Sequence, residues 1–259
     1  MMTLKYFLAF FFAVMPFSFF AQKSVQLKVM TYNLRFGELA SIKEIADFIV
    51  TCEPDFVALQ ELDCMTKRKR TPHQHNVNFV TELGYYTKMF PLYGKTISYA
   101  GGFYGIGMLT KFPYINVQKV MLPKQKEGHE ARALLMTEIE LTSGDTIIVA
   151  STHLDYTSMA SRAKQLEIIT QILKEKHFPI ILGGDFNATP DAMEIRTYFE
   201  DWQPLSINSQ LTSPAKEPKK KIDYLFGYPR KNWKLISSKV LKTSLSDHLP
   251  IFSEIELIN

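Results

Sequence analysis

The stretch IILGGDFNATP, at residues 180–190, joins an apolar run to a cluster of polar residues. Residues 179–185 are typical of a buried strand that ends on Asp185, and Asn187 follows two residues later. If the chain stays extended there, both side chains face the same side. Gly183 and Gly184 would remove side-chain bulk where a substrate or a metal has to approach.

The same arrangement, an apolar run bordered by a polar residue, recurs along the chain. The polar residues at these strand ends are Asn33, Glu61, His153, Asp185 with Asn187, Asp223, and Asp247 with His248. Taken singly, an Asn or Asp here would be interpreted as a turn or cap residue, and a His as a hydrogen-bonded core residue. Six such ends in one chain indicate a shared site, because active sites of layered α/β proteins are assembled from strand ends.

The pattern of strands and helices predicts the fold class. Segments rich in β-branched and aromatic residues are expected to be strands at 25–33, 56–62, 105–110, 134–141, 146–153, 179–185, 222–226 and 249–257. Apolar residues spaced by three and four predict helices over 42–49 and 160–173. The sequence LTSGDT at 141–146 predicts a tight hairpin, so the sheet cannot be purely parallel. We expect an α/β fold with two packed mixed β-sheets and helices on the outer faces.

Length and composition exclude several classes of protein. The chain has 259 residues, of which 46% are hydrophobic and 22% charged, with 12 Gly, 13 Pro and 2 Cys. These values exclude a disordered chain, a collagen and a disulfide-stapled miniprotein. No linker, repeat or low-complexity tract divides the sequence, so residues 22–259 are expected to form a single domain.

Residues 1–21 form a separate segment that is typical of an export signal. Lys5 is followed by an apolar run that ends at Ala21, which matches a charged start, a hydrophobic region and a small residue before a cut. We therefore expect an exported protein, periplasmic, secreted or on the outer surface. An uncleaved membrane anchor is the alternative, because Phe19 is bulky for a position three residues before the cut.

Charge and cysteines say less about function. Removal of residues 1–21 takes away Lys5 and no acid, which leaves 29 basic and 26 acidic residues, a balance of +3. Basic residues gather at 67–70 and at 216–221, where they could meet phosphates or simply form solvated loops. A strand over 56–62 would hold Cys52 and Cys64 too far apart for a disulfide, so two free, mostly buried thiols are expected.

The polar strand ends offer hard ligands, namely carboxylate and amide oxygens without a cysteine. Such ligands favour Mg²⁺, with Mn²⁺ or Ca²⁺ as alternatives, over a structural zinc. The two histidines match no compact zinc motif. Because Mg²⁺ needs only one or two carboxylates plus substrate phosphate, phosphoester hydrolysis is the first hypothesis.

Six short motifs in order resemble the endonuclease/exonuclease/phosphatase superfamily of metal-dependent phosphoesterases. They are TYNLR at 31–35, LQE at 59–61, STHLD at 151–155, GGDFNATP at 183–190, KIDYLF at 221–226 and SDHLPI at 246–251. The resemblance runs from about Lys28 to Leu257 and implies a four-layer α/β sandwich.

The resemblance also implies a role for each polar strand end. Glu61 would be the principal metal ligand, with Asn33 and Asp247 close to that metal or to a second one. Asp185 and Asn187 would position the attacking water and the phosphate oxygens.

The histidines complete the implied catalytic set. His248, oriented by Asp223, would hydrogen-bond the phosphate or act as a general base. His153 would donate a hydrogen bond to the phosphate or to the leaving group.

Two arginines are weaker candidates for phosphate contacts. Asp63, Thr66 and Arg68 resemble a stretch that follows the metal-binding Glu in secreted or membrane-associated bacterial hydrolases of the superfamily. The sequence Glu-Ala-Arg at 130–132 matches a recurrent Glu-x-Arg before a strand. Arg132 would bind phosphate or pair with an acid.

These features predict a secreted, Mg²⁺-dependent phosphoric ester hydrolase, a phosphodiesterase or a phosphomonoesterase, that acts on a small or lipid-derived phosphoester as a monomer. An extracellular DNase-like endonuclease is the alternative, although a balance of +3 is modest for a protein that binds duplex phosphates. Contact with a membrane surface stays open. A phosphate-binding module without catalysis is the third hypothesis, and the intact set of motifs argues against it. The sequence does not identify the substrate or the number of ions.

Overall fold

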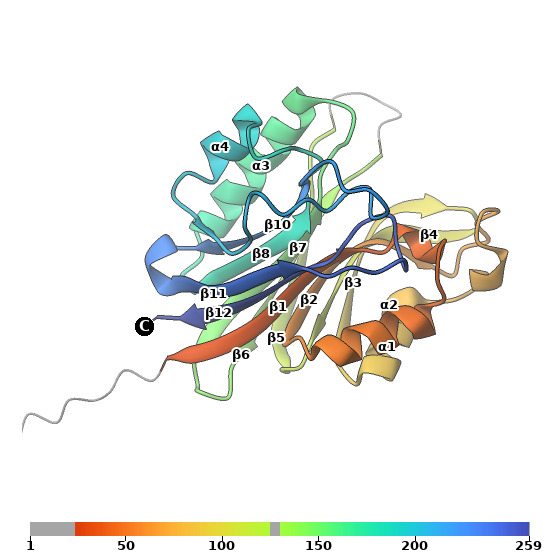
Figure 1. Cartoon of the computed structure of the whole chain (residues 1–259), viewed down its shortest axis with the longest axis horizontal. Coiled ribbons are helices and arrows are strands. Elements are labelled where there is room, and N and C mark those ends of the chain that lie inside the picture. The colour runs from red at the N-terminus through yellow and green to blue at the C-terminus, as the bar shows by residue number, and fades with distance from the viewer. Residues whose placement is uncertain (1–23, 125–129, 259) are drawn as a thin grey trace, which may run out of the picture.

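The computed structural model describes residues 24–124 and 130–258, and its strands form two six-stranded sheets that pack face to face (Figure 1). The predicted signal at residues 1–21 lies outside the described residues. In spatial order the first sheet consists of β11 (Trp233–Val240), β12 (Ile251–Leu257), β1 (Val25–Asn33), β2 (Phe56–Cys64), β4 (Gly102–Thr110) and β3 (Phe90–Tyr99). The second consists of β5 (Tyr114–Met121), β6 (Ala133–Glu140), β7 (Thr146–His153), β8 (Ile180–Asp185), β10 (Asp223–Tyr228) and β9 (Gln203–Pro204).

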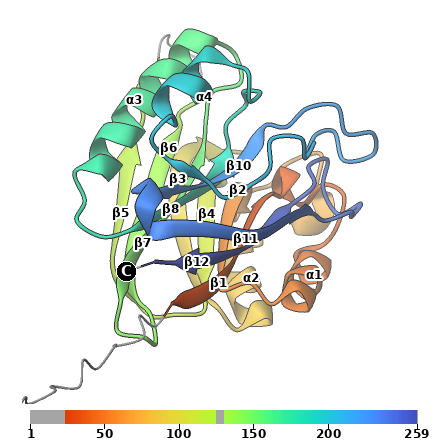
Figure 2. The same ribbon diagram turned by 60° about the vertical axis from the view of Figure 1, so that its left-hand side comes forward.

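Helices cover the outer face of each sheet, as Figures 1 and 2 show from two sides. The first sheet carries α1 (Ile42–Cys52) and α2 (Phe79–Thr87), and the second carries α3 (Met159–Lys174) and α4 (Met193–Tyr198). The α1 helix begins with a capping box, in which Ser41 and Glu44 each accept a hydrogen bond from the other's backbone N–H. The predicted four-layer α/β sandwich is confirmed.

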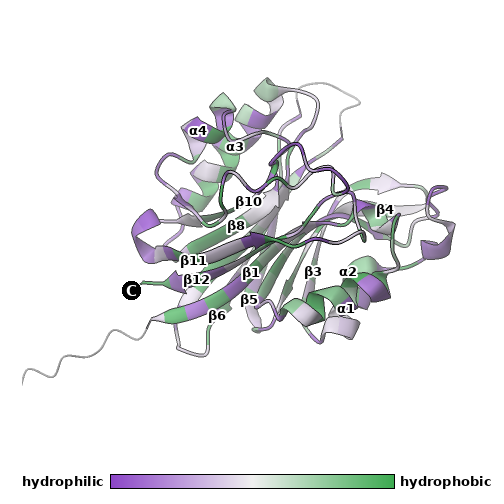
Figure 3. Cartoon of the chain, in the orientation of Figure 1, coloured by the Kyte–Doolittle hydropathy of each residue, from purple (hydrophilic) through white to green (hydrophobic). Residues whose placement is uncertain are grey.

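Three apolar clusters hold the four layers together. One lies between the sheets and includes Val29 of the first sheet and Val149 and Ile181 of the second. The other two lie between a sheet and its helices, and Figure 3 shows the helices with hydrophobic and hydrophilic residues on different sides. Within the described residues, no helix combines the length and the apolar character needed to cross a membrane.

Both sheets mix parallel and antiparallel strands, as the hairpin predicted. β1 runs parallel to β2, and β7 runs parallel to β8, so the carboxyl ends of each pair lie at the same edge. β10 runs antiparallel to β8, and β12 runs antiparallel to β1, so the chain segments that enter them start from that edge. Cys52 and Cys64 are unpaired, as expected.

Gly183 and Gly184 serve packing rather than substrate approach, which corrects the expectation from the sequence. A Cβ atom at Gly183 would lie 2.8 Å from the Cβ of Ala58 in the facing sheet. A Cβ at Gly184 would lie 2.3 Å from the carbonyl oxygen of Thr152 on β7. The missing side chains therefore allow β8 to approach the neighbouring strand and the opposite sheet.

We predict that Gly183→Ala lowers the free energy of unfolding by about 1–3 kcal/mol, because the added methyl group overpacks the space between the sheets. Urea denaturation measures this change. Ala58→Gly in the same chain removes the facing methyl group, so the double variant should lose less stability than the sum of the two single changes. Strict additivity would contradict the proposed contact.

Candidate active site

The residues predicted at strand ends meet at one edge of the sandwich, but Glu61 does not end a strand, because β2 continues to Cys64. His153 ends β7 and Asp185 ends β8, and the two residues pair across the parallel ladder. Asp223 begins β10 and pairs with Asp185 from the other side. Asn33 ends β1 of the facing sheet, and its amide reaches Asp185 across the two sheets. Asp185 is therefore the centre of the site.

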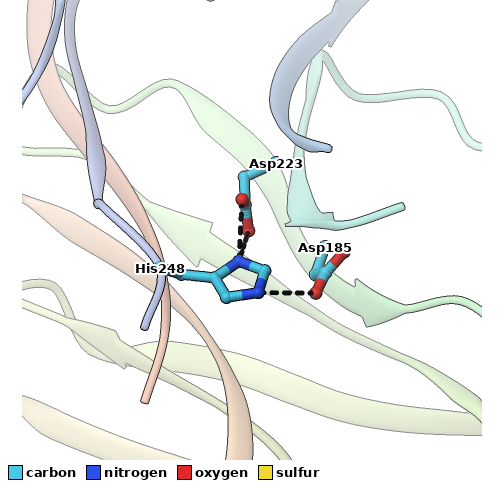
Figure 4. Close-up of side chains that lie close together, drawn as sticks. All are labelled: Asp185, Asp223 and His248. Atoms are coloured by element: carbon cyan, nitrogen blue, oxygen red, sulfur yellow. Dashed lines mark hydrogen bonds and ion pairs between the residues drawn. The ribbon is translucent and has the colours of Figure 1, made fainter. Parts of the chain in front are cut away.

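A chain of three groups, Asp223, His248 and Asp185, crosses the site (Figure 4). The Nδ1 of His248 lies 2.9 Å from Asp223 Oδ2 and 3.2 Å from Oδ1. Its Nε2 faces Asp185, at 3.8 Å from Oδ2. All three residues are buried. The imidazole therefore lies between two carboxylates, with Nδ1 engaged by Asp223 and Nε2 directed at the centre of the site.

This arrangement shifts the pKa values of Asp185 and His248. Burial alone lowers the pKa of His248, but the charges of Asp223 and Asp185 outweigh burial and raise it to about 10. Burial, followed by the charge of Asp223, raises the pKa of Asp185 above the ordinary value of a carboxyl group. His248 in the ligand-free state is consequently protonated at neutral pH and can donate a hydrogen bond from Nε2.

His153 lies on the other side of Asp185, and Arg132 fixes its protonation state. Arg132 Nη1 donates to His153 Nδ1 at 3.0 Å. Because a guanidinium group is only a donor, Nδ1 has to accept, and the ring proton resides on Nε2. Burial, then the charges of Arg132 and His248, lower the pKa of His153 well below its ordinary value. Its Nε2 lies 3.5 Å from Asp185 Oδ2, so a neutral imidazole points its N–H into the site.

Asn33 connects Asp185 to Glu61. Its Nδ2 donates to Glu61 Oε1 and to Asp185 Oδ2, at 3.0 Å in both cases. Glu61 lies where the pairing of β2 with β4 is irregular and has a φ of 59°, so the backbone there leaves the regular strand geometry. Two carboxylates and an amide therefore converge at the edge where the sheets face each other.

These oxygen donors fit a hard divalent cation. In addition, Asp185, Asp223 and His248 offer ligand atoms within 4.8 Å of one another, but His248 Nδ1 is already engaged by Asp223. Glu61, which is only half-buried and near the buried Asp185, is therefore the better position for an ion. Asn33 presents Nδ2 to Glu61, so it could ligate an ion there only with its amide turned over.

Asp247 contacts an arginine that the sequence interpretation had not singled out. Arg35 Nη1 donates to Asp247, and Arg35 Nε donates to Glu38. Ser246 is a second residue without an assigned role, and its Oγ donates to the carbonyl oxygen of Asn33 at 2.7 Å. Arg35 ends the motif TYNLR that contains Asn33, and Ser246 begins the motif SDHLPI that contains Asp247. Their positions beside candidate residues are the signal that could have identified them.

Asn187 reaches the site by a turn and not by an extended chain, which corrects the expected geometry. Its φ is 48°, and its backbone N–H donates to Asp185 Oδ1 at 2.9 Å. Its Nδ2 donates to the carbonyl oxygen of Leu154 at 3.0 Å. This contact ties the loop after β8 to the loop after β7.

The two candidate phosphate-binding arginines already have acidic partners. Arg68 makes a bidentate pair with the buried Asp63, at 2.8 Å for each bond, and Thr66 Oγ1 donates to the same carboxylate. Arg132 Nη1 lies 2.8 Å from Glu130 Oε1. Phosphate binding by either arginine stays a prediction.

The sequence was compared with models of known protein families and with curated proteins. Residues 30–248 match the sequence model described as the Endonuclease/Exonuclease/phosphatase family. No curated protein matches the chain in sequence.

Solved structures with the same fold include three with stated classes or activities. A family protein from Bacteroides thetaiotaomicron has a TM-score of 0.74 and 14% identity, and the match covers 92% of this chain and 100% of that one. The mannosyl-6-phosphatase Bt3783 of B. thetaiotaomicron VPI-5482 has a TM-score of 0.71 and 16% identity, with coverages of 88% and 99%. ANGEL2, described as a 2′,3′-cyclic phosphatase, has a TM-score of 0.69 and 15% identity, with coverages of 90% and 96%.

We predict that Asp223→Asn lowers the pKa of His248 well below 10 in metal-free protein, because Asn preserves an acceptor for Nδ1 but removes the negative charge that favours the imidazolium. An NMR titration of the ring protons measures this value. Asp247→Asn is the matched control, because Asp247 is the weaker neighbour and should lower the pKa of His248 less. A pKa of His248 that is unchanged in Asp223→Asn would refute the assignment.

Proposed function

Because the chain belongs to the endonuclease/exonuclease/phosphatase family, we propose that it is a metal-dependent phosphoester hydrolase that acts on a small or lipid-derived phosphoester. Members of this family are hydrolases of phosphoesters, and the family is generally metal-dependent. The proposal covers cleavage of phosphodiesters or phosphomonoesters.

One observation carries the proposal, namely the convergence of hydrogen-bond donors and acceptors around Asp185. His248, on the loop that leads into β12, places its Nε2 3.8 Å from Asp185 Oδ2. His153, at the end of β7, places its Nε2 3.5 Å from the same oxygen. Asn33 donates to the same oxygen from the opposite sheet. A scissile phosphate needs such donors, because its negative charge repels a nucleophile until the oxygens are neutralised.

We assign Mg²⁺ as the ion, with Mn²⁺ or Ca²⁺ as alternatives and one or two ions in the active form. Glu61 would be the principal ligand, and Asn33 and Asp247 would complete the site. When bound, such an ion supplies positive charge that polarises the phosphoryl oxygens. Arg35 would hold the Asp247 carboxylate in place through its hydrogen bond.

His248 acts as the donor to the phosphate in this proposal. Its Nδ1 stays bound to Asp223, which fixes the ring and leaves the Nε2–H for the substrate. Asp185, with Oδ1 held by the Asn187 backbone N–H, orients the attacking water. The geometry thus supports a hydrogen-bonding role for His248 over the general-base role, which the sequence left open.

His153 and Asn187 complete the donor set. The Arg132 guanidinium holds Nδ1 of His153 as an acceptor, so the Nε2–H is available to the phosphate or to the leaving group. Asn187 lies on the loop after Asp185, where its amide is anchored on Leu154, and it would position a phosphate oxygen. In this proposal Arg132 orients the His153 ring through its hydrogen bond to Nδ1.

Small phosphoesters are favoured over nucleic acid for two reasons. Two proteins of the same fold are described as a mannosyl-6-phosphatase and a 2′,3′-cyclic phosphatase. The balance of +3 after residue 21 is also low for a protein whose affinity depends on neutralising duplex phosphates. We further propose that the protein is exported by its first 21 residues, works as a monomer, and could meet lipid substrates at a membrane surface.

We predict that Glu61→Gln abolishes the stimulation of phosphoester hydrolysis by Mg²⁺, while the free energy of unfolding changes little because the amide is isosteric with the carboxylate. Hydrolysis of bis(p-nitrophenyl) phosphate over a Mg²⁺ series measures the effect. Glu140→Gln, on an exposed strand end, is the matched control and should behave as wild type. Equal Mg²⁺ stimulation in Glu61→Gln would overturn the ligand assignment.

A plasmid-nicking assay with Mg²⁺ separates the small-substrate hydrolase from the nuclease. We expect slow nicking compared with turnover of small phosphoesters, because the balance of +3 after residue 21 is modest for binding a duplex. Rapid nicking that is lost in His248→Ala would establish the nuclease alternative instead. Nicking that persists in His248→Ala would indicate a contaminating enzyme.

A further inference from the structure

A pocket of about 590 Å³ opens between residues 67–70 and residues 99–101. Four consecutive basic residues line one wall, and Tyr99, at the end of β3, lines the other. A larger pocket of about 810 Å³ lies beside α4 and includes none of the candidate active-site residues. The larger pocket is lined by acidic and basic residues, whereas the charged residues that line the smaller pocket are all basic.

The loop that carries these basic residues is held in place by backbone hydrogen bonds. The N–H of Lys67 donates to the carbonyl oxygen of Ala100 at 2.8 Å, which joins the two walls of the pocket. The N–H of Asn76 donates to Thr66 at 2.9 Å. His75 Nε2 lies 2.9 Å from the carbonyl oxygen of Arg68. A pocket with both walls fixed can bind a ligand without ordering a flexible loop first.

Arg68 is one of the residues that line the pocket, and it stacks against aromatic rings. Its guanidinium lies 4.2 Å from the centre of the Tyr99 ring and 3.9 Å from the centre of the Phe36 ring. The pair with Asp63 occupies Nε and one side of Nη2, so N–H groups on the opposite edge remain for a ligand. Arg68 is thus held in place by Asp63 and by two aromatic rings.

The carboxylates around the pocket do not balance its cations. Asp63 pairs with Arg68, and Glu38 is shared by Arg70 and Arg35. Within the described part of the chain, the exposed Lys67 and Lys69 have no carboxylate partner within 4 Å. The pocket therefore keeps positive charge that an anionic group can neutralise.

The pocket adjoins the catalytic edge through shared residues. Asp63, the partner of Arg68, follows Glu61 by two residues on β2 and pairs with Tyr104 on β4. Phe36, which packs against Arg68, follows Arg35, the residue that donates to Asp247. The pocket therefore lies next to the part of the catalytic edge that carries Glu61 and Arg35.

The second basic stretch, at residues 216–221, lacks these properties. Lys221 is buried, and its Nζ donates to Ser206 Oγ at 3.1 Å, so this side chain is directed into the fold. Lys219 has Glu217 within 3.9 Å. This stretch accordingly offers less free positive charge than residues 67–70.

We propose that the pocket formed by residues 67–70 and 99–101 binds a second phosphate of the substrate, so that the preferred substrates carry two separated phosphate groups. The inference rests on the proposed hydrolase function and narrows its substrate class. Arg68 and the two unpaired lysines hold the distal phosphate, while the catalytic edge receives the phosphate that is cleaved. Sugar bisphosphates and nucleoside bisphosphates share this chemistry.

The test compares each bisphosphate with its monophosphate. Steady-state kcat and KM are measured with Mg²⁺ for fructose 1,6-bisphosphate against fructose 6-phosphate, and for adenosine 3′,5′-bisphosphate against adenosine 5′-monophosphate. Lys67→Ala/Lys69→Ala should raise KM for the preferred bisphosphate about tenfold and leave the monophosphates unchanged, since charge-assisted hydrogen bonds are lost only at the distal phosphate. The matched control is Lys88→Ala/Lys231→Ala, which removes two other exposed lysines and should change none of these values.

The outcomes separate the two proposals. If Lys67→Ala/Lys69→Ala raises KM for fructose 1,6-bisphosphate alone, or for adenosine 3′,5′-bisphosphate alone, that result identifies the source of the second phosphate. Turnover with the same bisphosphate-to-monophosphate ratio in the wild type and in Lys67→Ala/Lys69→Ala overturns the pocket while the hydrolase proposal stands. If no substrate is turned over, calorimetric binding of the same bisphosphates decides, because equal affinity of the two proteins overturns the pocket independently of catalysis.

Discussion

The carboxylate of Asp185, buried at the end of β8, is the group on which the site depends. Burying a carboxylate away from water costs free energy unless hydrogen bonds or opposite charges compensate for the lost hydration. Here the compensation comes from separate parts of the chain: the Asn33 amide, the backbone N–H of Asn187 and the two imidazoles. Because β1, β7, β8 and the segments entering β10 and β12 all meet at one edge, these groups converge only when both sheets are in place.

The polar site and the apolar core are joined by buried hydrogen bonds between the sheets. Gln60 of β2 reaches Ser151 of β7 at 3.4 Å, and Ser151 Oγ donates to the carbonyl oxygen of Leu59 at 3.2 Å. Gly183, which pairs with Ser151 in the parallel ladder, lets β8 approach the opposite sheet. The catalytic edge is therefore set by close contacts between rigid strands, which suits a site whose donors have to be positioned before the substrate binds.

Much of the fold could be predicted from the sequence, and the strands that were missed share one feature. The eight predicted strands are confirmed, whereas β3, β5, β9 and β11 were not predicted, and these four are the edge strands of the two sheets. Edge strands are partly exposed, as in β5, where every residue except Val120 is exposed, so they lack the apolar pattern that identifies a buried strand. The short α4 and the α2 helix were missed as well.

The residues of the site were predicted better than their geometry. Asn33, Asp185 and His248 converge as expected. They could be predicted because the sequence changes abruptly from apolar to polar residues near the end of a strand. The turn at Asn187 needs a positive φ, and the packing role of Gly183 depends on a facing sheet, so neither follows from local sequence. The contact between Arg35 and Asp247 joins residues more than 200 positions apart and depends on the tertiary fold.

The most direct test of the account is the rate of Mg²⁺-dependent hydrolysis of bis(p-nitrophenyl) phosphate and p-nitrophenyl phosphate by Asp185→Asn. The substitution keeps the shape of the side chain and removes the charge around which the site is organised. The account predicts that kcat falls by about 10²–10⁴-fold while the free energy of unfolding stays close to that of the wild type or rises. A rate equal to that of the wild type in folded Asp185→Asn would contradict it.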